Sequence, residues 1–329
     1  MQTLCSSKFN KLVIFIIIIG LIAINYTTFS YKSFIPGAAL IIGILLNSLH
    51  RDSHILHHTK IWSSHFLNYA IICLGFGFNL TNILKAGLSG IWYTIISISA
   101  TLIIGLLIGK FLKNPGKIST LISSGTAICG GSAIAAIAPI IRSSHEETTV
   151  AMGAIFLLNA IGLLIFPIIG HNLHLNQHQF GLLAALAIHD TSSVVGSCMA
   201  YGQTSLVVGT TIKLVRALWI IPVSIIIAMI YARMKHNEIQ NTKTKKPWFI
   251  LWFILASLLV TLFPQLSSIG LHLKHFGESL FMVALFLIGY NVSFTNLKTV
   301  GGKVLLQAVI LWILVSIIVI LALKARILY

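Results

Sequence analysis

The chain has 329 residues, of which 57% are hydrophobic and only 9% are charged, with a mean hydropathy of +0.96. Soluble domains carry about 25% charged residues, so this composition excludes a soluble globular protein and indicates a polytopic membrane protein. The formal net charge is +16. Most of the basic residues lie in short loops between apolar runs, where they indicate membrane topology rather than a surface for nucleic acid.

Apolar runs along the chain predict eleven membrane-spanning helices. Several are short for a hydrocarbon core of about 30 Å, which needs about 20 helical residues. Short or glycine-interrupted spans are common in transporters with broken helices. No small-residue cleavage site follows the first run, so it is predicted as a retained span and not as a signal peptide. The expected spans are residues 11–26, 34–49, 63–80, 88–112, 118–141, 148–170, 179–200, 204–232, 248–264, 277–292 and 303–325.

The distribution of Lys and Arg predicts the orientation in the membrane. With the N-terminus inside, 14 of the 22 Lys and Arg residues fall in cytoplasmic segments and 6 on the opposite side. Because positive residues are enriched in cytoplasmic loops, this bias predicts an N-in, C-out chain, which requires an odd number of spans. The polar, basic stretch 235–246 is predicted as a cytoplasmic linker within a single membrane domain.

A run of small residues at 125–134 interrupts the composition of the fifth span. Paired glycines weaken a helix where lipid offers no replacement hydrogen bonds, so we predict a break near 129–131. A half-helix that begins at Ser132 would direct free N–H groups toward an anion. A close helix–helix crossing is the alternative, because small residues also produce one. The candidate substrate-binding residues of this stretch are Gly125, Thr126, Cys129, Gly130, Gly131 and Ser132.

Four ionisable residues inside apolar spans are candidates for function: His189, Asp190, Lys213 and Arg216. A charged residue costs about 2.5–3.5 kcal/mol on insertion. Lys213 and Arg216 are three residues apart and therefore share a helix face. At about 1.5 Å per residue along antiparallel helices, Asp190 and the two cations lie at similar depth and can meet. Two cations against one carboxylate predict a net positive site for an anion. A structural ion pair between two helices is the alternative.

The remaining polar residues form no catalytic or metal-binding pattern. The four cysteines show no CxxC or CxxH spacing, which predicts neither a disulfide framework nor a zinc site. Histidines cluster at 50–65 and 171–178, in the loops after the second and sixth spans, and are expected to be solvated. Glu146 and Glu147 open the sixth span, where acids cap a helix N-terminus. Without hydrolase, metalloprotease or nucleotide-binding motifs, we expect no enzyme, no cofactor and no resident metal.

The stretch 125–134, followed by Ala138 and Pro139, resembles the GTxICGxSAI motif of the YeiH family of bacterial sulfate exporters. The segments 188–190 (Ile-His-Asp) and 213–216 (Lys-Leu-Val-Arg) are similar to two further elements of that family. The chain departs from the family pattern at one place, and this difference bears on the coupling ion and the substrate rather than on the fold. Where the family has Glu-x-x-Gln after the histidine, this chain has Asp-Thr-Ser-Ser.

The resemblance implies a multi-pass protein of the bacterial inner membrane. It also implies kinship with ten-helix transporters of the bile acid symporter and sodium/proton antiporter type, which have two inverted repeats of five helices and discontinuous helices that cross. The repeats would cover residues 34–170 and 179–325. The fifth and tenth spans would then be the crossing pair.

Together these patterns predict an all-α secondary transporter that exports a small inorganic or sulfonate-like anion, such as sulfate, by alternating access. Lys213 and Arg216 would supply charge, and His189 or Asp190 would couple transport to a proton or ion. Expected partners are the anionic solute and the lipid bilayer, with a homodimer as a further possibility. Two alternatives remain: a cation/proton antiporter with Asp190 as carrier, and a membrane scaffold or receptor without transport.

Overall fold

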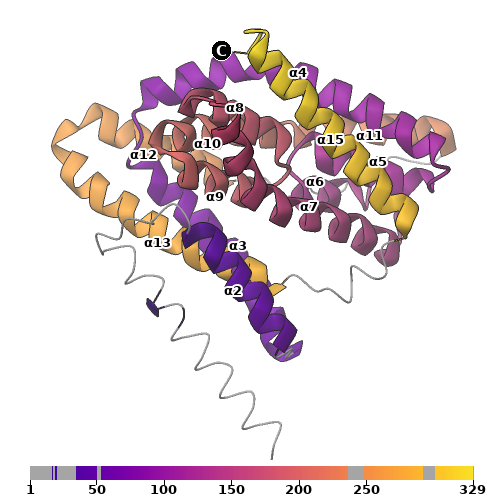
Figure 1. Cartoon of the computed structure of the whole chain (residues 1–329), viewed down its shortest axis with the longest axis horizontal. Coiled ribbons are helices and arrows are strands. Elements are labelled where there is room, and N and C mark those ends of the chain that lie inside the picture. Colours follow the sequence, from indigo (N-terminus) through magenta and orange to yellow (C-terminus); the bar gives the residue numbers. More distant parts are fainter. Residues whose placement is uncertain are drawn as a thin grey trace, which may run out of the picture. The chain divides into compact units, whose positions relative to one another are not determined.

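The computed structural model describes residues 35–49, 53–235, 248–291 and 301–328, together with Ile17, Ile19 and Gly20. All regular structure within these residues is helical, as the apolar composition predicts (Figure 1). Most of the expected first span, 11–26, and nearly all of the expected linker, 235–246, lie outside the described residues.

Five helical segments of the described residues are long and apolar enough to cross a membrane: Gly90–Phe111, His145–Asn172, Gln203–Tyr231, Pro264–Asn291 and Gly302–Lys324. These segments agree with a multi-pass membrane protein, while the number of spans, their sidedness and the inverted repeat stay predictions. The elements are α2 (Ile35–Leu49), α3 (Ser53–Gly75), α4 (Leu80–Phe111), α5 (Gly116–Ala127), α6 (Gly131–Ile137), α7 (His145–Asn172), α8 (Gln177–Ala187), α9 (Thr191–Tyr201), α10 (Gln203–Leu218), α11 (Ile220–Lys235), α12 (Trp248–Leu262), η2 (Pro264–Leu266), α13 (Ser267–Asn291) and α15 (Gly302–Lys324).

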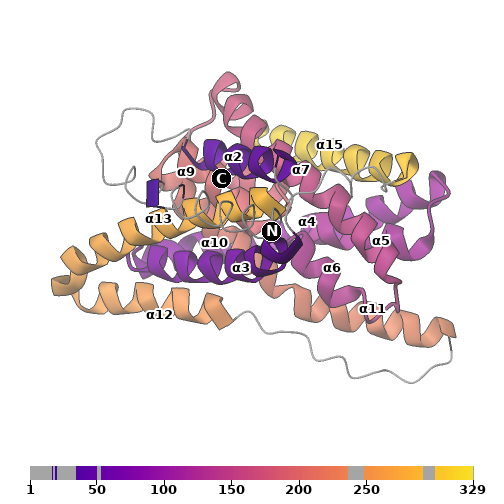
Figure 2. The same ribbon diagram turned by 90° about the horizontal axis from the view of Figure 1, so that it is seen from below.

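The chain forms two compact units, each of which combines segments that are distant in sequence. The first unit contains residues 1–83 and 247–294, and the second contains residues 84–246 and 295–329. In the first unit, α13 packs along α2 and α3, and α12 packs on α3. The orange helices α12 and α13 follow one another through η2 (Figure 2).

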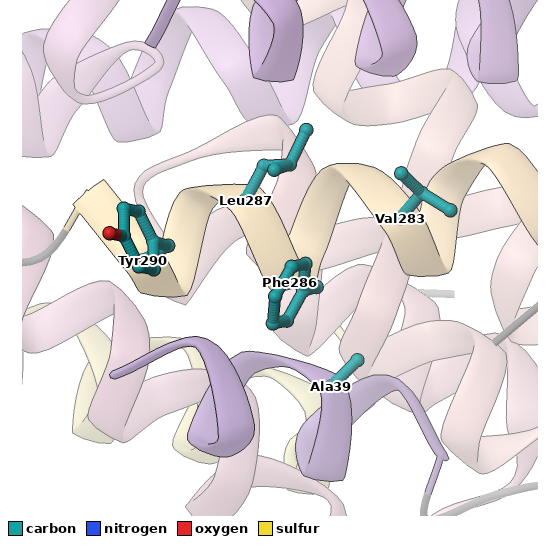
Figure 3. Packing of buried hydrophobic residues seen from close by; sticks show 5 residues of the cluster. All are labelled: Ala39, Val283, Phe286, Leu287 and Tyr290. Atoms are coloured by element: carbon teal, nitrogen blue, oxygen red, sulfur yellow. The ribbon is translucent and has the colours of Figure 1, made fainter. Parts of the chain in front are cut away.

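A buried hydrophobic cluster of the first unit lies between α2 and α13. Its five buried residues are Ala39, Val283, Phe286, Leu287 and Tyr290. Figure 3 shows the ring of Phe286 pointing from α13 toward Ala39 of α2. The two backbones approach closely because Gly43 and Gly289 lack side chains: a Cβ at Gly43 would overlap the carbonyl oxygen of Phe286. Small residues allow such close helix packing in membrane proteins.

The second unit is built around two interrupted helices, α5–α6 and α8–α9. Helix α7 packs against α5, α6 and α9, and α15 packs against α5, α7 and α8. Helices α8, α9 and α10 lie side by side (Figure 1). Helix α7 begins with a capping box, in which Ser144 and Glu147 satisfy each other's backbone N–H groups. This confirms the predicted capping role at the start of the sixth span.

Two features of the helices differ from the sequence predictions. The tenth span, expected to be discontinuous, is the uninterrupted helix α13, because its glycines serve close packing rather than a break. The seventh span, expected to be continuous, is interrupted at 188–190 instead. The crossing partner of the fifth span was therefore predicted wrongly. Histidines 54–65 lie in α3, which begins at Ser53, and not in a loop.

We expect Gly289→Leu to destabilise the first unit, because any side chain at this position would overlap the carbonyl oxygen of Leu40. Overpacking of an interior costs about 1–3 kcal/mol, which would lower the apparent unfolding temperature of the full chain in detergent. Gly302→Ala is the control, since no atom lies within 4 Å of the position of its Cβ. Equal unfolding temperatures for the two variants would contradict the close approach of α2 and α13.

Candidate functional site

Two helix interruptions meet inside the second unit. Helix α5 ends at Ala127 and α6 begins at Gly131, while α8 ends at Ala187 and α9 begins at Thr191. A Cβ at Gly130, in the first interruption, would lie 3.4 Å from the Cβ of Asp190 in the second. Each interruption leaves carbonyl groups without partners at one helix end and N–H groups at the other, and lipid cannot satisfy them. We call the place where 126–130 and 188–190 meet the junction.

The first interruption follows from two glycines, as the sequence predicts. Gly130 has φ 69° and ψ −125°, a conformation that only glycine adopts without strain. A Cβ at Gly131 would lie 2.7 Å from the ring of Phe156 on α7. The half-helix α6 begins at Gly131, one residue before the predicted start at Ser132. The break of the fifth span is therefore confirmed.

The Arg216 guanidinium on α10 joins the carbonyl ends of both interrupted helices. It is fully buried, with an exposed fraction of 0%. Its Nε donates to the Ala127 carbonyl at 2.6 Å, and its Nη2 donates to the Thr126 carbonyl at 3.1 Å. Its Nη1 donates to the carbonyl groups of Ala185 and Leu186 at 3.1 and 2.6 Å. The rigid fork of N–H donors suits this task, which a single ammonium could not perform.

Lys213 and Trp312 satisfy the remaining carbonyl groups at the end of α8. The Lys213 Nζ, also fully buried, donates to the carbonyl groups of Ile188 at 2.7 Å and Ala185 at 3.5 Å. The indole N–H of Trp312 on α15 donates to the Ala187 carbonyl at 3.1 Å. Positive side chains stabilise helix C-termini, where the helix dipole is negative. Both cations therefore compensate for the helix interruptions.

Asp190 caps the helix that follows the second interruption. Its carboxylate accepts hydrogen bonds from the backbone N–H groups of Ser192 and Ser193 at 3.0 and 3.1 Å, and from both serine hydroxyls. The sequence predicts that Asp190 meets Lys213 and Arg216, and the structure brings these residues to one junction. However, no ion pair links them within the part of the chain that the structure describes. Carbonyl groups, and not Asp190, are the immediate partners of the cations.

Asn159 on α7 is a member of the junction that sequence reasoning missed. Its Oδ1 accepts the backbone N–H groups of His189 and Asp190 at 3.2 and 3.3 Å. On the other side, its Nδ2 lies 3.5 Å from the position of a Cβ at Gly130. One amide thus lies between the two interruptions. A lone Asn within the apolar span 148–170 was the signal that could have identified it.

Three buried side chains at the junction have polar atoms without a hydrogen-bond partner among the described residues. They are the Thr126 hydroxyl, the Asn159 Nδ2 and both ring nitrogens of His189. The exposed fractions of these residues are 0, 3 and 1%. Buried polar groups are nearly always paired with protein, water or ligand. The junction therefore has unused hydrogen-bonding capacity.

The other predicted site residues have mainly packing roles. A Cβ at Gly125 would lie 3.0 Å from Ile134, so this glycine gives α6 its place beside α5. Cys129 is buried in the first interruption, and its sulfur accepts a hydrogen bond from the backbone N–H of Ala133. Ser132 is an exposed residue of the first turn of α6. In the described ranges, no cluster of His, Cys, Asp or Glu is placed to hold a metal ion.

A buried acid in the first unit was also missed. Glu278 lies near the middle of α13, with an exposed fraction of 8%. Its carboxylate lies 3.2 Å from the His275 ring and 3.8 Å from the Lys274 ammonium on the same helix. Glu278 falls at the edge of a span that was expected to begin at 277, because the polar first turns of α13 lower the local hydropathy.

Gly130→Ala should destabilise the second unit, because alanine at this φ and ψ carries strain of about 1–3 kcal/mol. The Cβ would also contact Asp190 and Ile155 at 3.4 Å. The measurement is the unfolding temperature of the full chain in detergent. Gly116→Ala is the control, since nothing lies within 4 Å of its Cβ position. An unchanged unfolding temperature for Gly130→Ala would contradict the backbone conformation of the first interruption.

Arg216→Lys keeps the positive charge but loses the fork that reaches both helix ends. Leaving buried carbonyl groups unpaired costs about 1–3 kcal/mol, so we expect a lower unfolding temperature in detergent. Arg142→Lys, at an exposed position of the same unit, should leave the temperature unchanged. If Arg216→Lys were as stable as the wild type, bridging by the guanidinium would not contribute to the fold.

The comparisons with known proteins agree with this membrane architecture. The model of the family described as conserved hypothetical protein 698 matches residues 10–308. A UPF0324 membrane protein of Bdellovibrio bacteriovorus is 50% identical over 85% of this chain and 86% of its own length. UPF0324 membrane proteins of Vibrio parahaemolyticus and Bacteroides thetaiotaomicron are 47 and 45% identical, over 84 and 85% of this chain and 89 and 84% of their own lengths. No solved structure matches. The chain therefore belongs to the UPF0324 family of membrane proteins, which is the YeiH-type family.

Proposed function

We propose that the protein is a secondary transporter of a small anion in the bacterial inner membrane, and that it works by alternating access. The observation that carries this proposal is the junction of two interrupted helices with two fully buried cations. Interrupted helices that meet inside a membrane protein are typical of the substrate sites of secondary transporters. Buried charge in an apolar protein is costly and marks function by default.

The charges at the junction favour an anionic solute. Lys213 and Arg216 bring two positive charges, and Asp190 brings one negative charge. An ammonium has three N–H donors and a guanidinium has five, but the carbonyl groups receive only two and four of them. Among the described residues, both cations therefore keep a donor after they have satisfied the helix ends. Sulfate or a sulfonate-like anion is the candidate that the resemblance to the YeiH family supports.

The contacts give less support to the cation/proton antiporter. In transporters with broken helices, carbonyl groups at half-helix C-termini coordinate sodium ions or protons. Here Lys213 and Arg216 are hydrogen-bonded to these groups. The Asp190 carboxylate is held by four hydrogen bonds from two serines, which suits a helix cap better than a mobile carrier. His189 is then the better candidate for coupling to a proton. A scaffold or receptor without transport would not need two interrupted helices.

Proteoliposomes test the proposal directly. The purified full chain is reconstituted, and the uptake of labelled sulfate and other anions is measured together with currents after jumps in anion, sodium or pH. We expect anion flux that needs no nucleotide. Flux or current evoked by sodium or protons alone would overturn anion transport and favour the antiporter. The absence of both flux and current for every solute would favour a scaffold or receptor.

Thr126→Val should reduce anion flux about tenfold without lowering stability. Valine has the same shape, and the Thr126 hydroxyl has no partner among the described residues, so its loss breaks no hydrogen bond between them. A hydrogen bond to a charged solute is worth about 1.5–3 kcal/mol. Thr94→Val on α4 is the matched control, since that hydroxyl donates to the Ile91 carbonyl of its own helix. Equal flux in the two variants would count against Thr126 as a solute contact.

A further inference from the structure

The Asn159 amide has one satisfied side and one unsatisfied side, and the hydrogen bonds establish which is which. Its oxygen accepts two backbone N–H groups, from His189 and Asp190. An NH₂ group could not accept them, so the opposite orientation of the amide is excluded. The donor Nδ2 must therefore point away from the second interruption. It faces Gly130, in the first interruption, where glycine leaves room beside it.

An unpaired buried donor is costly, and Asn159 is one of three residues of the junction that have unpaired buried polar atoms. Leaving one such group without a partner costs about 1–3 kcal/mol, which a hydrophobic residue of similar size would avoid. Thr126 and His189 add a hydroxyl and an imidazole in the same condition. These three residues come from α5, from α7 and from the α8–α9 interruption, so several chain segments contribute unused donors to one place.

The number of these donors and the separate chain segments that supply them indicate the chemistry of the ligand. A halide accepts hydrogen bonds at a single centre, whereas an oxyanion presents several acceptor oxygens in different directions. Donors that come from three separate chain segments match the second pattern. Lys213 and Arg216, which lie close enough to His189 to interact electrostatically, provide the balancing charge.

We infer that Asn159 and His189 form the recognition site of the transported solute, and that they bind a small oxyanion at the junction. The Nδ2 of Asn159 donates to one oxygen, and the His189 ring forms a second hydrogen bond. This inference rests on the proposed transport function and goes beyond it, because it names the recognition residues and the class of solute. Asn159 also positions the α8–α9 interruption, so bound solute and helix interruption share one side chain.

Asn159→Asp is the decisive variant. It keeps an oxygen to accept the two backbone N–H groups and replaces the donor by a second oxygen, which repels an anion. Binding of labelled sulfate, sulfite and phosphate to the purified full chain is measured, with chloride as a competitor, followed by flux in proteoliposomes. We expect the affinity for the bound oxyanion to fall about tenfold or more. Competition by chloride at equal concentration should be weak.

His189→Phe is the second variant, in case the added charge of Asn159→Asp prevents folding. It removes both ring nitrogens, yet the hydrogen bond to Asn159 uses the backbone N–H and is kept. The same loss of affinity is expected. His178→Phe is the matched control, because it makes the same change in the first turn of α8, eleven residues before His189 in the chain, and it should bind like the wild type.

The outcomes separate the inference from the function on which it rests. If wild-type protein binds and transports an oxyanion and both variants match it, the recognition site is wrong and anion transport stands. If chloride competes as well as the oxyanions, the solute class is wrong. If the wild type neither binds nor transports any anion, the proposed function fails and the inference fails with it. Loss of oxyanion affinity in both junction variants, with the control unchanged, supports the inference.

Discussion

The second unit depends on the way in which one guanidinium satisfies the carbonyl ends of two interrupted helices. An interruption in an apolar protein exposes polar backbone groups that lipid cannot pair. Arg216 hydrogen-bonds to Thr126 and Ala127 at the end of α5, and to carbonyl groups near the end of α8. Lys213 and Trp312 add the remaining donors. With these contacts, two interruptions that would each destabilise the protein become parts of one hydrogen-bonded structure.

Where a helix begins after an interruption, its backbone N–H groups need partners, and residues other than the cations supply them. Asp190 caps α9, and Asn159 holds the backbone just before it. Cations therefore lie at the negative helix ends and a carboxylate lies at a positive one, as helix dipoles favour. Between the two sets of contacts remain Thr126 and His189, whose polar atoms have no partner among the described residues. Spare hydrogen-bonding groups thus remain at the junction after the structural requirements of both interruptions have been met.

Sequence reasoning identified part of this site, and the physical reasons for its failures are local. The interruption at Gly130 was predictable, since paired glycines inside an apolar run have few other uses. The interruption at Asp190 had an equally local signal, an acid followed by Thr-Ser-Ser. However, the acid was interpreted as a residue that couples transport to a proton or ion rather than as a helix cap. The expectation that Lys213 and Arg216 meet the chain segment beside Asp190 agrees with their contacts at the end of α8. Their partners could not be predicted, because backbone carbonyl groups are free to accept these hydrogen bonds only where a helix ends, and the end of α8 was not predicted.

The bridging position of Arg216 also restricts how the protein can move. The ends of α5 and α8 are both held by the same planar, rigid group, and each pair of hydrogen bonds has a length between 2.6 and 3.1 Å. Sliding one interrupted helix against the other by more than a fraction of an ångström would break bonds on one side of the guanidinium. The two interrupted helices are therefore expected to behave as a single rigid body. A conformational cycle would have to carry both together, with its hinges elsewhere in the chain.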